Sequence, residues 1–157
     1  MRDRLVLVPD LKQKLRDDLT TAMKARDELT TATLRMVLAA VTAEEVAGKE
    51  ARELTDDEVQ AVLRREAKKR REAAEAFAGA GRTEQAEREQ AEGDVVAAYL
   101  PQQLSDADLT ALVAEVVAAT GASGLGDMGK VMGRATKEVA GRAEGGRVAA
   151  EVRRQLA

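Results

Sequence analysis

After Pro9, an apolar residue stands at every fourth position, in the order Leu11, Leu15, Leu19 and Met23. An α-helix turns once in about 3.6 residues, so this spacing places the four side chains in one stripe along a helix. Comparable helical spacing recurs down the chain, whereas no segment of useful length alternates apolar and polar residues as a half-buried strand does. The pattern predicts an all-α fold.

The residues available for a core agree with that prediction. Hydrophobic residues make up 45% of the chain and are mostly Ala, Val and Leu, with one Phe (Phe77), one Tyr (Tyr99) and no Trp. Such a core is built from small aliphatic side chains, which closely packed helices accommodate well and a β-sandwich poorly.

Signals for helix starts and ends divide the chain into seven predicted helices. Thr55-Asp56-Asp57-Glu58 has the sequence of a capping box, and Ser105-Asp106-Ala107-Asp108 is a second signal of this kind. Glycines and Pro101 provide the breaks, because proline disfavours helical geometry at the residue before it. We expect helices at about residues 11–26, 28–47, 56–78, 83–100, 106–121, 127–139 and 146–155.

The short polar segment Gln102-Gln103, directly after Pro101, is the best position for a domain boundary. A chain of 157 residues is long enough for one domain or for two small ones. We therefore expect an N-terminal domain of about four helices at residues 1–101 and a small three-helix C-terminal domain at residues 102–157.

The chain contains neither Cys nor His. This excludes disulfides, thiolate nucleophiles, Cys/His zinc sites and any catalytic triad that uses imidazole. Paired acids such as Asp17-Asp18 and Glu44-Glu45 come with no companion nucleophile and no metal-ligand pattern. We predict no catalytic residue, no metal and no cofactor.

The apolar run Leu5–Val8 near the N-terminus is too short for the apolar core of a signal peptide. No apolar run approaches the length needed to cross a membrane. We expect a cytoplasmic protein that does not associate with membranes.

The net charge of −3 gives no general attraction to nucleic acid, but the C-terminal segment is locally basic. Residues 121–157 contain seven Lys and Arg against four Asp and Glu. Local basic patches can steer a polyanion even when the whole protein is slightly negative. The candidate nucleic-acid-binding residues are Lys130, Arg134, Lys137, Arg142, Gly145, Gly146 and Arg147.

The turn from Gly141 to Arg147 is the most specific signal within that candidate site. Gly145 and Gly146 stand at a predicted helix start, where backbone N–H groups are unpaired, and Arg142 and Arg147 flank them. Such a helix start can bind phosphate. Alternatively, the glycines only permit a tight turn, and we weigh the two interpretations evenly. No aromatic residue lies nearby to stack on a base, so any contact is expected with the RNA backbone and shape.

A second basic patch lies in the predicted helix at 56–78. Residues 64–71 hold six cations and one acid, and helical spacing puts Arg64, Lys68 and Arg71 on one stripe. This stripe could contact phosphates. We favour the alternative of a solvated face paired with Glu72, Glu75 and acids of a neighbouring helix, because charge runs on helices are common.

The segment Gly124–Lys130 matches the G-x-x-x-x-G-K spacing of a phosphate-binding P-loop. The next residue is Val131, where a P-loop has the Ser or Thr that holds Mg²⁺, and the preceding element is a predicted helix instead of a strand. We therefore interpret the segment as a loop and helix start. Gly129 and Gly133, four residues apart, would form a smooth face that another helix can approach closely.

Several short stretches together resemble a known family. The chain is similar over nearly its whole length to the YqeY-like proteins of the GatB/YqeY family. The matching stretches are Leu34-Arg35-Met36-Val37, Glu53-Leu54-Thr55-Asp56-Asp57-Glu58-Val59, Tyr99-Leu100-Pro101-Gln102-Gln103-Leu104-Ser105, Asp127-Met128-Gly129-Lys130-Val131-Met132 and Gly141-Arg142-Ala143.

The resemblance implies two helical parts, of which the second is similar to the tail domain of the B subunit of tRNA-dependent amidotransferase. In that enzyme the tail helps to hold tRNA, and amide transfer takes place elsewhere. For this chain, a label of carbon–nitrogen ligase with glutamine as amido donor would rest on fold analogy alone. The resemblance thus implies a non-catalytic protein that binds tRNA or another structured RNA, or an accessory factor of amidotransferase. The alternative is a protein-interaction module with no nucleic-acid role.

The chain departs from the family pattern at the start of the last helix. The family commonly has an Asp-Gly pair followed by Lys there, whereas this chain has Glu144-Gly145-Gly146-Arg147. Glutamate is a poorer N-cap than aspartate, so we expect this helix start to be weakly capped.

Overall fold

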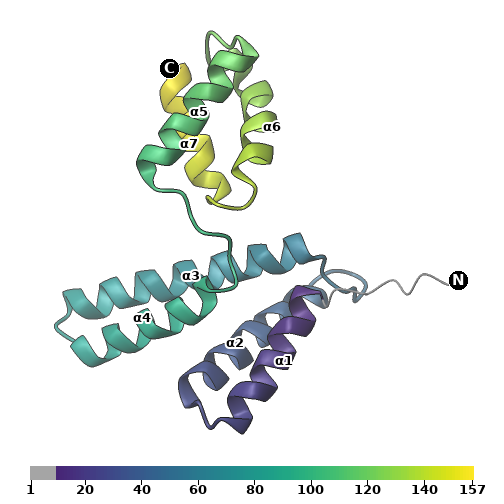
Figure 1. The fold of residues 1–157 in the computed structure, drawn as a ribbon, viewed down its shortest axis with the longest axis vertical. Coiled ribbons are helices and arrows are strands. Elements are labelled where there is room, and N and C mark those ends of the chain that lie inside the picture. Colours follow the sequence, from purple (N-terminus) through teal and green to yellow (C-terminus); the bar gives the residue numbers. More distant parts are fainter. Residues whose placement is uncertain (1–9) are drawn as a thin grey trace, which may run out of the picture. The chain divides into compact units, whose positions relative to one another are not determined.

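The computed structural model describes residues 10–157, and every regular element in that range is helical (Figure 1). The short apolar run Leu5–Val8 lies outside the described residues. The all-α prediction is confirmed for residues 10–157, which contain no strand. The elements are α1 (Leu11–Lys24), α2 (Glu28–Glu45), α3 (Asp56–Gly79), α4 (Thr83–Ala97), α5 (Asp106–Thr120), the 3₁₀ turn η1 (Leu125–Asp127), α6 (Met128–Val139) and α7 (Gly145–Leu156).

The chain folds into two compact units, one that ends at Tyr99 and one that runs from Leu100 to Ala157. The N-terminal unit contains α1 to α4, and the C-terminal unit contains α5, η1, α6 and α7. Each unit is described by itself below. The division into independent domains at residues 101 and 102 stays a prediction.

Helix starts in the N-terminal unit follow the capping signals of the sequence. Asp27 accepts a hydrogen bond from the N–H of Thr30 at 3.1 Å at the start of α2. At the start of α3, Thr55 Oγ1 accepts from the N–H of Glu58 at 3.3 Å, and Glu58 Oε1 accepts from the N–H of Thr55 at 3.2 Å. The predicted capping box is therefore confirmed, and it pairs N–H groups that a helix start otherwise leaves free.

The core of the N-terminal unit consists of small aliphatic side chains. Helix α2 contacts each of the other three helices, and α3 packs along α4 (Figure 1). The side chains that are fully or almost fully buried are branched aliphatics: Leu15, Leu34, Val37, Val41, Val59, Val62, Leu63 and Val96. This agrees with a core expected to lack aromatic rings.

The turn between α1 and α2 departs from the sequence prediction. Helix α1 ends at Lys24 because Arg26 takes the left-handed conformation, with φ of 55°. The N–H of Asp27 then donates to the carbonyl of Ala22 at 3.0 Å. Glycine is the usual residue at such a position, and a side chain there costs about 1 kcal/mol.

Met23 is not part of the buried stripe that its spacing predicts. A step of four residues exceeds one helical turn, so a stripe at every fourth position drifts by about 40° each step. The stripe begins with Leu11 at the interface, and by Met23 it has rotated out to solvent. Met23 is 49% exposed, and Ala22 is buried in its place.

Tyr99 holds the end of the N-terminal unit against α1. Helix α4 ends at Ala97, earlier than predicted, and the Tyr99 hydroxyl donates to Asp18 Oδ2 at 2.5 Å. The Lys14 ammonium lies 5.4 Å from the centre of the Tyr99 ring, within the range of a cation–π contact. Burial, and then the hydrogen bond to Asp18, raise the pKa of the Tyr99 phenol above its usual value.

The C-terminal unit is a three-helix arrangement around a single core. Ser105 caps α5 by accepting from the N–H of Asp108 at 3.1 Å, and Gly121, with φ of 69°, ends it. The N–H of Leu104 donates to the carbonyl of Arg142 at 2.7 Å and so joins the segment before α5 to the turn after α6. The core residues are Leu109, Val113, Val116, Val131, Ala135, Val139, Ala143, Val148, Val152 and Leu156.

No single helix within residues 10–157 is both long and apolar enough to span a membrane. Helix α5 and the segment Leu125–Val139 meet the length and composition criteria only as a pair that is bent by 93°.

Candidate nucleic-acid interface

Three of the predicted site residues lie on one face of α6. Lys130, Arg134 and Lys137 follow each other at intervals of four and three residues, which places them in one stripe. All three are exposed, and the buried residues Ala135 and Val139 face the core from the other side of the helix. The helical spacing of the local sequence thus places the cations on the solvent face of α6 and the aliphatic residues on its core face.

The three cations of this α6 stripe differ in what they contact. Arg134 Nε donates to Glu138 Oε1 at 3.2 Å, and both side chains are largely exposed. Within residues 10–157, neither Lys130 nor Lys137 forms an ion pair with a carboxylate. Exposed ion pairs contribute little free energy, so Arg134 can exchange Glu138 for another anion.

Arg142, by contrast, bonds to its own helix. Its Nε donates to the carbonyl of Val139 at 3.0 Å, and a terminal nitrogen donates to the carbonyl of Glu138 at 2.8 Å. Carbonyls in the last turn of a helix have no backbone partner and carry partial negative charge. The guanidinium therefore caps the C-terminus of α6.

Arg147 also has partners inside the C-terminal unit. One of its terminal nitrogens donates to the carbonyl of Leu104 at 3.2 Å and to Asp106 Oδ1 at 2.9 Å. These bonds tie the first turn of α7 to the start of α5. Arg142 and Arg147, the two arginines expected to flank a phosphate site, thus both form intramolecular bonds.

The glycines at the start of α7 are exposed, and the structure does not require glycine at either position. Neither has positive φ; a Cβ on Gly145 would meet no atom within 4 Å, and one on Gly146 would meet only Glu144 Oε1 at 3.8 Å. Glu144 makes no side-chain hydrogen bond to the first turn of α7, as expected for a poor N-cap. The first N–H groups of α7 thus have no side-chain cap, and the carboxylate of Glu144 lies beside Gly146.

The second basic patch lies on α3, where Lys68 and Arg71 are exposed and Arg64 is half-buried. Arg65, Lys69 and Arg70 of the same run form ion pairs, for example Arg65 with Glu44 at 3.4 Å. The acids that pair with Arg65, Lys69 and Arg70 are Glu66 of the same helix and Glu44, Glu89 and Glu92 of neighbouring helices. Pairing of the stripe Arg64, Lys68 and Arg71 with Glu72 and Glu75 stays a prediction.

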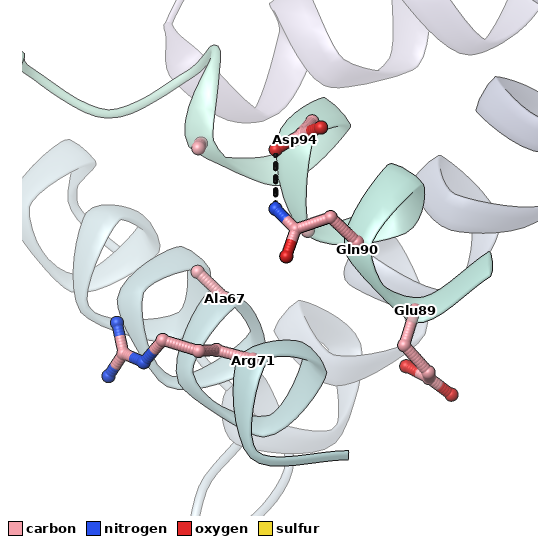
Figure 2. A pocket seen from close by; sticks show the side chains of 7 residues that line it. Ala67, Arg71, Glu89, Gln90 and Asp94 are labelled. Carbon is pink, nitrogen blue, oxygen red and sulfur yellow. Dashed lines mark hydrogen bonds between the residues drawn. The ribbon is translucent and has the colours of Figure 1, made fainter. Parts of the chain in front are cut away.

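Arg71 lines a hollow of about 180 Å³ between α3 and α4 (Figure 2). Figure 2 shows Arg71 and Glu89 pointing away from each other, and Gln90 donating to Asp94 Oδ1 at 3.1 Å. A Cβ on Gly93, which also lines the hollow, would lie 3.4 Å from the Cβ of Arg70. The hollow thus results from close packing of the two helices around small residues.

Sequence reasoning missed a charge network between helices of the N-terminal unit, which is buried at Glu66 and exposed at Glu28. Glu66 is only 4% exposed, and Arg70 lies 3.8 Å from Glu66, 3.3 Å from Glu89 and 3.5 Å from Glu92. Arg88 continues the network from Glu92 at 2.9 Å to Glu28 at 2.8 Å. These pairs join α2, α3 and α4, so part of the basic run stabilises the fold and is not available to a ligand.

Two observations bear on nucleotide and metal sites in the described part of the chain. The P-loop-like segment Gly124–Lys130 follows helix α5 and not a strand. Residues 10–157 contain no group of three or more acidic side chains placed to hold a metal ion.

Two comparisons with known proteins extend the structural description. The family model for Yqey-like protein matches residues 12–156, nearly the whole chain. A relative from Schizosaccharomyces pombe, described as an uncharacterized protein, is 32% identical over 100 residues. The aligned part covers 63% of this chain and 79% of the relative. Its description gives no activity or ligand.

Proposed function

The chain belongs to the YqeY-like family, and on that premise we propose that it is a non-catalytic protein that binds tRNA or another structured RNA. In this proposal the C-terminal unit contacts the phosphate backbone through the α6 stripe. The chain acts as an accessory factor in the cytoplasm, and any amide transfer takes place on another protein.

The observation that carries the proposal is the stripe of Lys130, Arg134 and Lys137. A rise of 1.5 Å per residue spreads these three charges over about 10 Å of helix. A linear array of exposed cations suits an extended phosphate strand better than a single small anion. The α7 start adds backbone N–H groups that no side chain caps, and helix starts of this kind favour phosphate.

The composition of the C-terminal unit supports contact with the backbone of a folded RNA. Residues 100–157 contain no Phe, Tyr or Trp, so no aromatic ring is present to stack on a splayed base. Recognition of single-stranded sequence usually depends on such stacking, whereas structured RNA is recognised through shape and phosphates. The resemblance of this unit to the amidotransferase tail domain favours tRNA among the structured RNAs.

The proposal is tested by crosslinking the full chain to RNA in cells and sequencing the bound RNA. We expect tRNA to dominate the bound fraction, and we expect Lys130→Ala with Lys137→Ala to reduce it strongly. Lys49→Ala with Arg82→Ala removes two exposed cations from the N-terminal unit and is the matched control. Recovery of no RNA above background, or equal loss in the control, would contradict the proposal.

One observation favours a second candidate function, a protein-interaction module. Leu125, which is 54% exposed, stands four and eight residues before Gly129 and Gly133. A Cβ added to either glycine would meet no atom within 4 Å, so this side of α6 has room for a helix of a partner. This function predicts a protein complex that survives nuclease treatment and is lost in Leu125→Glu.

A further inference from the structure

A second exposed site lies on the α1–α2 hairpin of the N-terminal unit and shares no residue with the α6 stripe. A hollow of about 420 Å³ opens there, and we call it the hairpin hollow. We propose that it binds an acidic segment of a partner protein that also carries an apolar side chain. The residues that line the hairpin hollow are Met23, Arg26, Glu28, Thr31, Ala32 and Arg35.

Arg26 has a backbone conformation that residues with a side chain rarely adopt. Its φ of 55° lies in the left-handed region, and it stands at the end of α1 where helices commonly have glycine. Strained residues that persist are found preferentially at ligand-binding sites. Within residues 10–157, the guanidinium forms no ion pair that would explain an arginine at this position.

Arg35 supplies a second cation from the facing helix. Glu28, Thr31, Ala32 and Arg35 follow each other at the spacing of one helix face, so α2 lines one side of the hollow. A terminal nitrogen of Arg35 lies 3.9 Å from Met23 Sδ. In the described part of the chain Arg35 has no carboxylate partner, so two exposed guanidinium groups line the same hollow.

The acidic residue of the rim has a cation partner outside the hollow. Glu28 accepts two hydrogen bonds from Arg88, at 2.8 and 3.1 Å. The bond from Arg88 lowers the pKa of the Glu28 carboxyl below its usual value. Within residues 10–157, Glu28 pairs with Arg88 and forms no ion pair with Arg26 or Arg35.

The exposed methionine distinguishes a protein segment from a nucleic acid. Met23 is 49% exposed and lines the hollow together with Ala32, which gives an apolar surface beside the cations. Methionine is flexible and polarizable, so it adapts to apolar side chains of different shape. Two arginines bind carboxylates in a planar, two-pronged way. Together these features are complementary to a segment with acidic residues next to an aliphatic one.

The probe for this site is a short fluorescein-labelled peptide of alternating Glu and Leu, added to the full chain at moderate salt. We expect it to bind, with NMR shift changes confined to amides of residues 22–35. A peptide of alternating Glu and Ser keeps the charge and lacks the apolar side chain, and we expect it to bind at least about tenfold more weakly. Equal binding of both peptides, stronger binding of an RNA duplex at these amides, or concentration-dependent self-association through them would overturn the proposal.

The decisive variant is Arg26→Gly, because it removes the cation and also relieves the left-handed backbone, so the fold is retained. We expect Arg26→Gly and Arg35→Gln each to weaken binding of the Glu-Leu peptide about tenfold or more, as loss of a two-pronged arginine contact does. Arg153→Ala, which removes an exposed cation from the C-terminal unit, is the control and should leave binding unchanged. Unchanged affinity in Arg26→Gly would refute the proposal, whereas RNA binding by the α6 stripe would be unaffected by either result.

Discussion

Arg142 is expected to stabilise the C-terminal unit more than it contributes to RNA binding. Its guanidinium donates to the carbonyls of Val139 and Glu138, at 3.0 and 2.8 Å, in the last turn of α6. Arg142→Ala leaves both carbonyls without a side-chain partner and removes a positive charge from the negative end of the helix. We therefore predict a loss of stability in this variant.

The size of the loss follows from those contacts. A hydrogen bond from a charged donor contributes about 1.5–3 kcal/mol when buried, and a cation at a helix C-terminus about 0.3–1 kcal/mol. Arg142 is half-buried, so the lower part of this range applies. We expect Arg142→Ala to lower the free energy of unfolding by about 1–2 kcal/mol, which lowers Tm by roughly 4 °C or more for a unit of this size.

The assay is urea unfolding of the full chain followed by circular dichroism, with amide hydrogen exchange to assign the loss to α5, α6 and α7. Arg142→Lys keeps the positive charge but cannot donate two hydrogen bonds in the fixed geometry of a guanidinium. Its free energy of unfolding should therefore lie between those of Arg142→Ala and the wild type. Lys137→Ala, an exposed change near the same helix end, should stay within about 0.5 kcal/mol of the wild type. The reasoning fails if Arg142→Ala unfolds like the wild type but no longer binds tRNA.

Three further predictions test other parts of the structure. Gly133→Ala fills open space in the interior of α6, so it should raise the free energy of unfolding by up to about 1 kcal/mol and leave RNA affinity unchanged; a destabilised variant would show that the space is not free. Leu34→Ala removes a fully buried side chain and should cost about 3 kcal/mol in urea unfolding; a loss below about 1 kcal/mol would indicate that Leu34 is not in the core. Hydrogen bonds from Arg154, and then from Gln155, lower the pKa of Glu151 from 4.5 to about 2. Because this pKa is lower in the folded state, the stability that it contributes is present above about pH 4.5 and is lost as the pH falls toward 2. Glu151→Gln should reduce the dependence of the free energy of unfolding on pH in this range. An unchanged dependence would contradict the role given to the Glu151 carboxylate.

The sequence predicted the helices because their signals are local. Capping at Thr55 and Ser105 depends on residues three positions apart. The break at Gly121 or Pro101 depends on the backbone conformation that this one residue allows or imposes. Such features depend on residues that are near one another in the sequence, so they are recognised without knowledge of tertiary contacts. The scarcity of aromatic residues likewise predicted an aliphatic core without knowledge of which helices meet.

The parts that sequence reasoning did not predict depend on long-range contacts. Arg70 reaches Glu89 and Glu92 on another helix, and nothing in the run of charges marks Glu66 as buried. Arg147 bonds to Asp106, 41 residues away in the sequence. At the candidate site, local positive charge in the sequence predicted Lys130, Arg134 and Lys137 as candidates. Only the structure places them in one stripe and distinguishes Lys130 from the arginines that form intramolecular bonds.

The central claim is that exposed cations of α6 hold the phosphate backbone of a structured RNA. The most direct measurement is filter binding of a tRNA transcript to the full chain over a series of salt concentrations. Three phosphate contacts predict that log K falls against log salt with a slope of about −2 to −3, and Lys130→Ala with Lys137→Ala should weaken binding and reduce the slope by about two. The control Lys49→Ala with Arg82→Ala should behave as the wild type. The claim is contradicted if tRNA does not bind at low salt, or if the two double variants give the same slope.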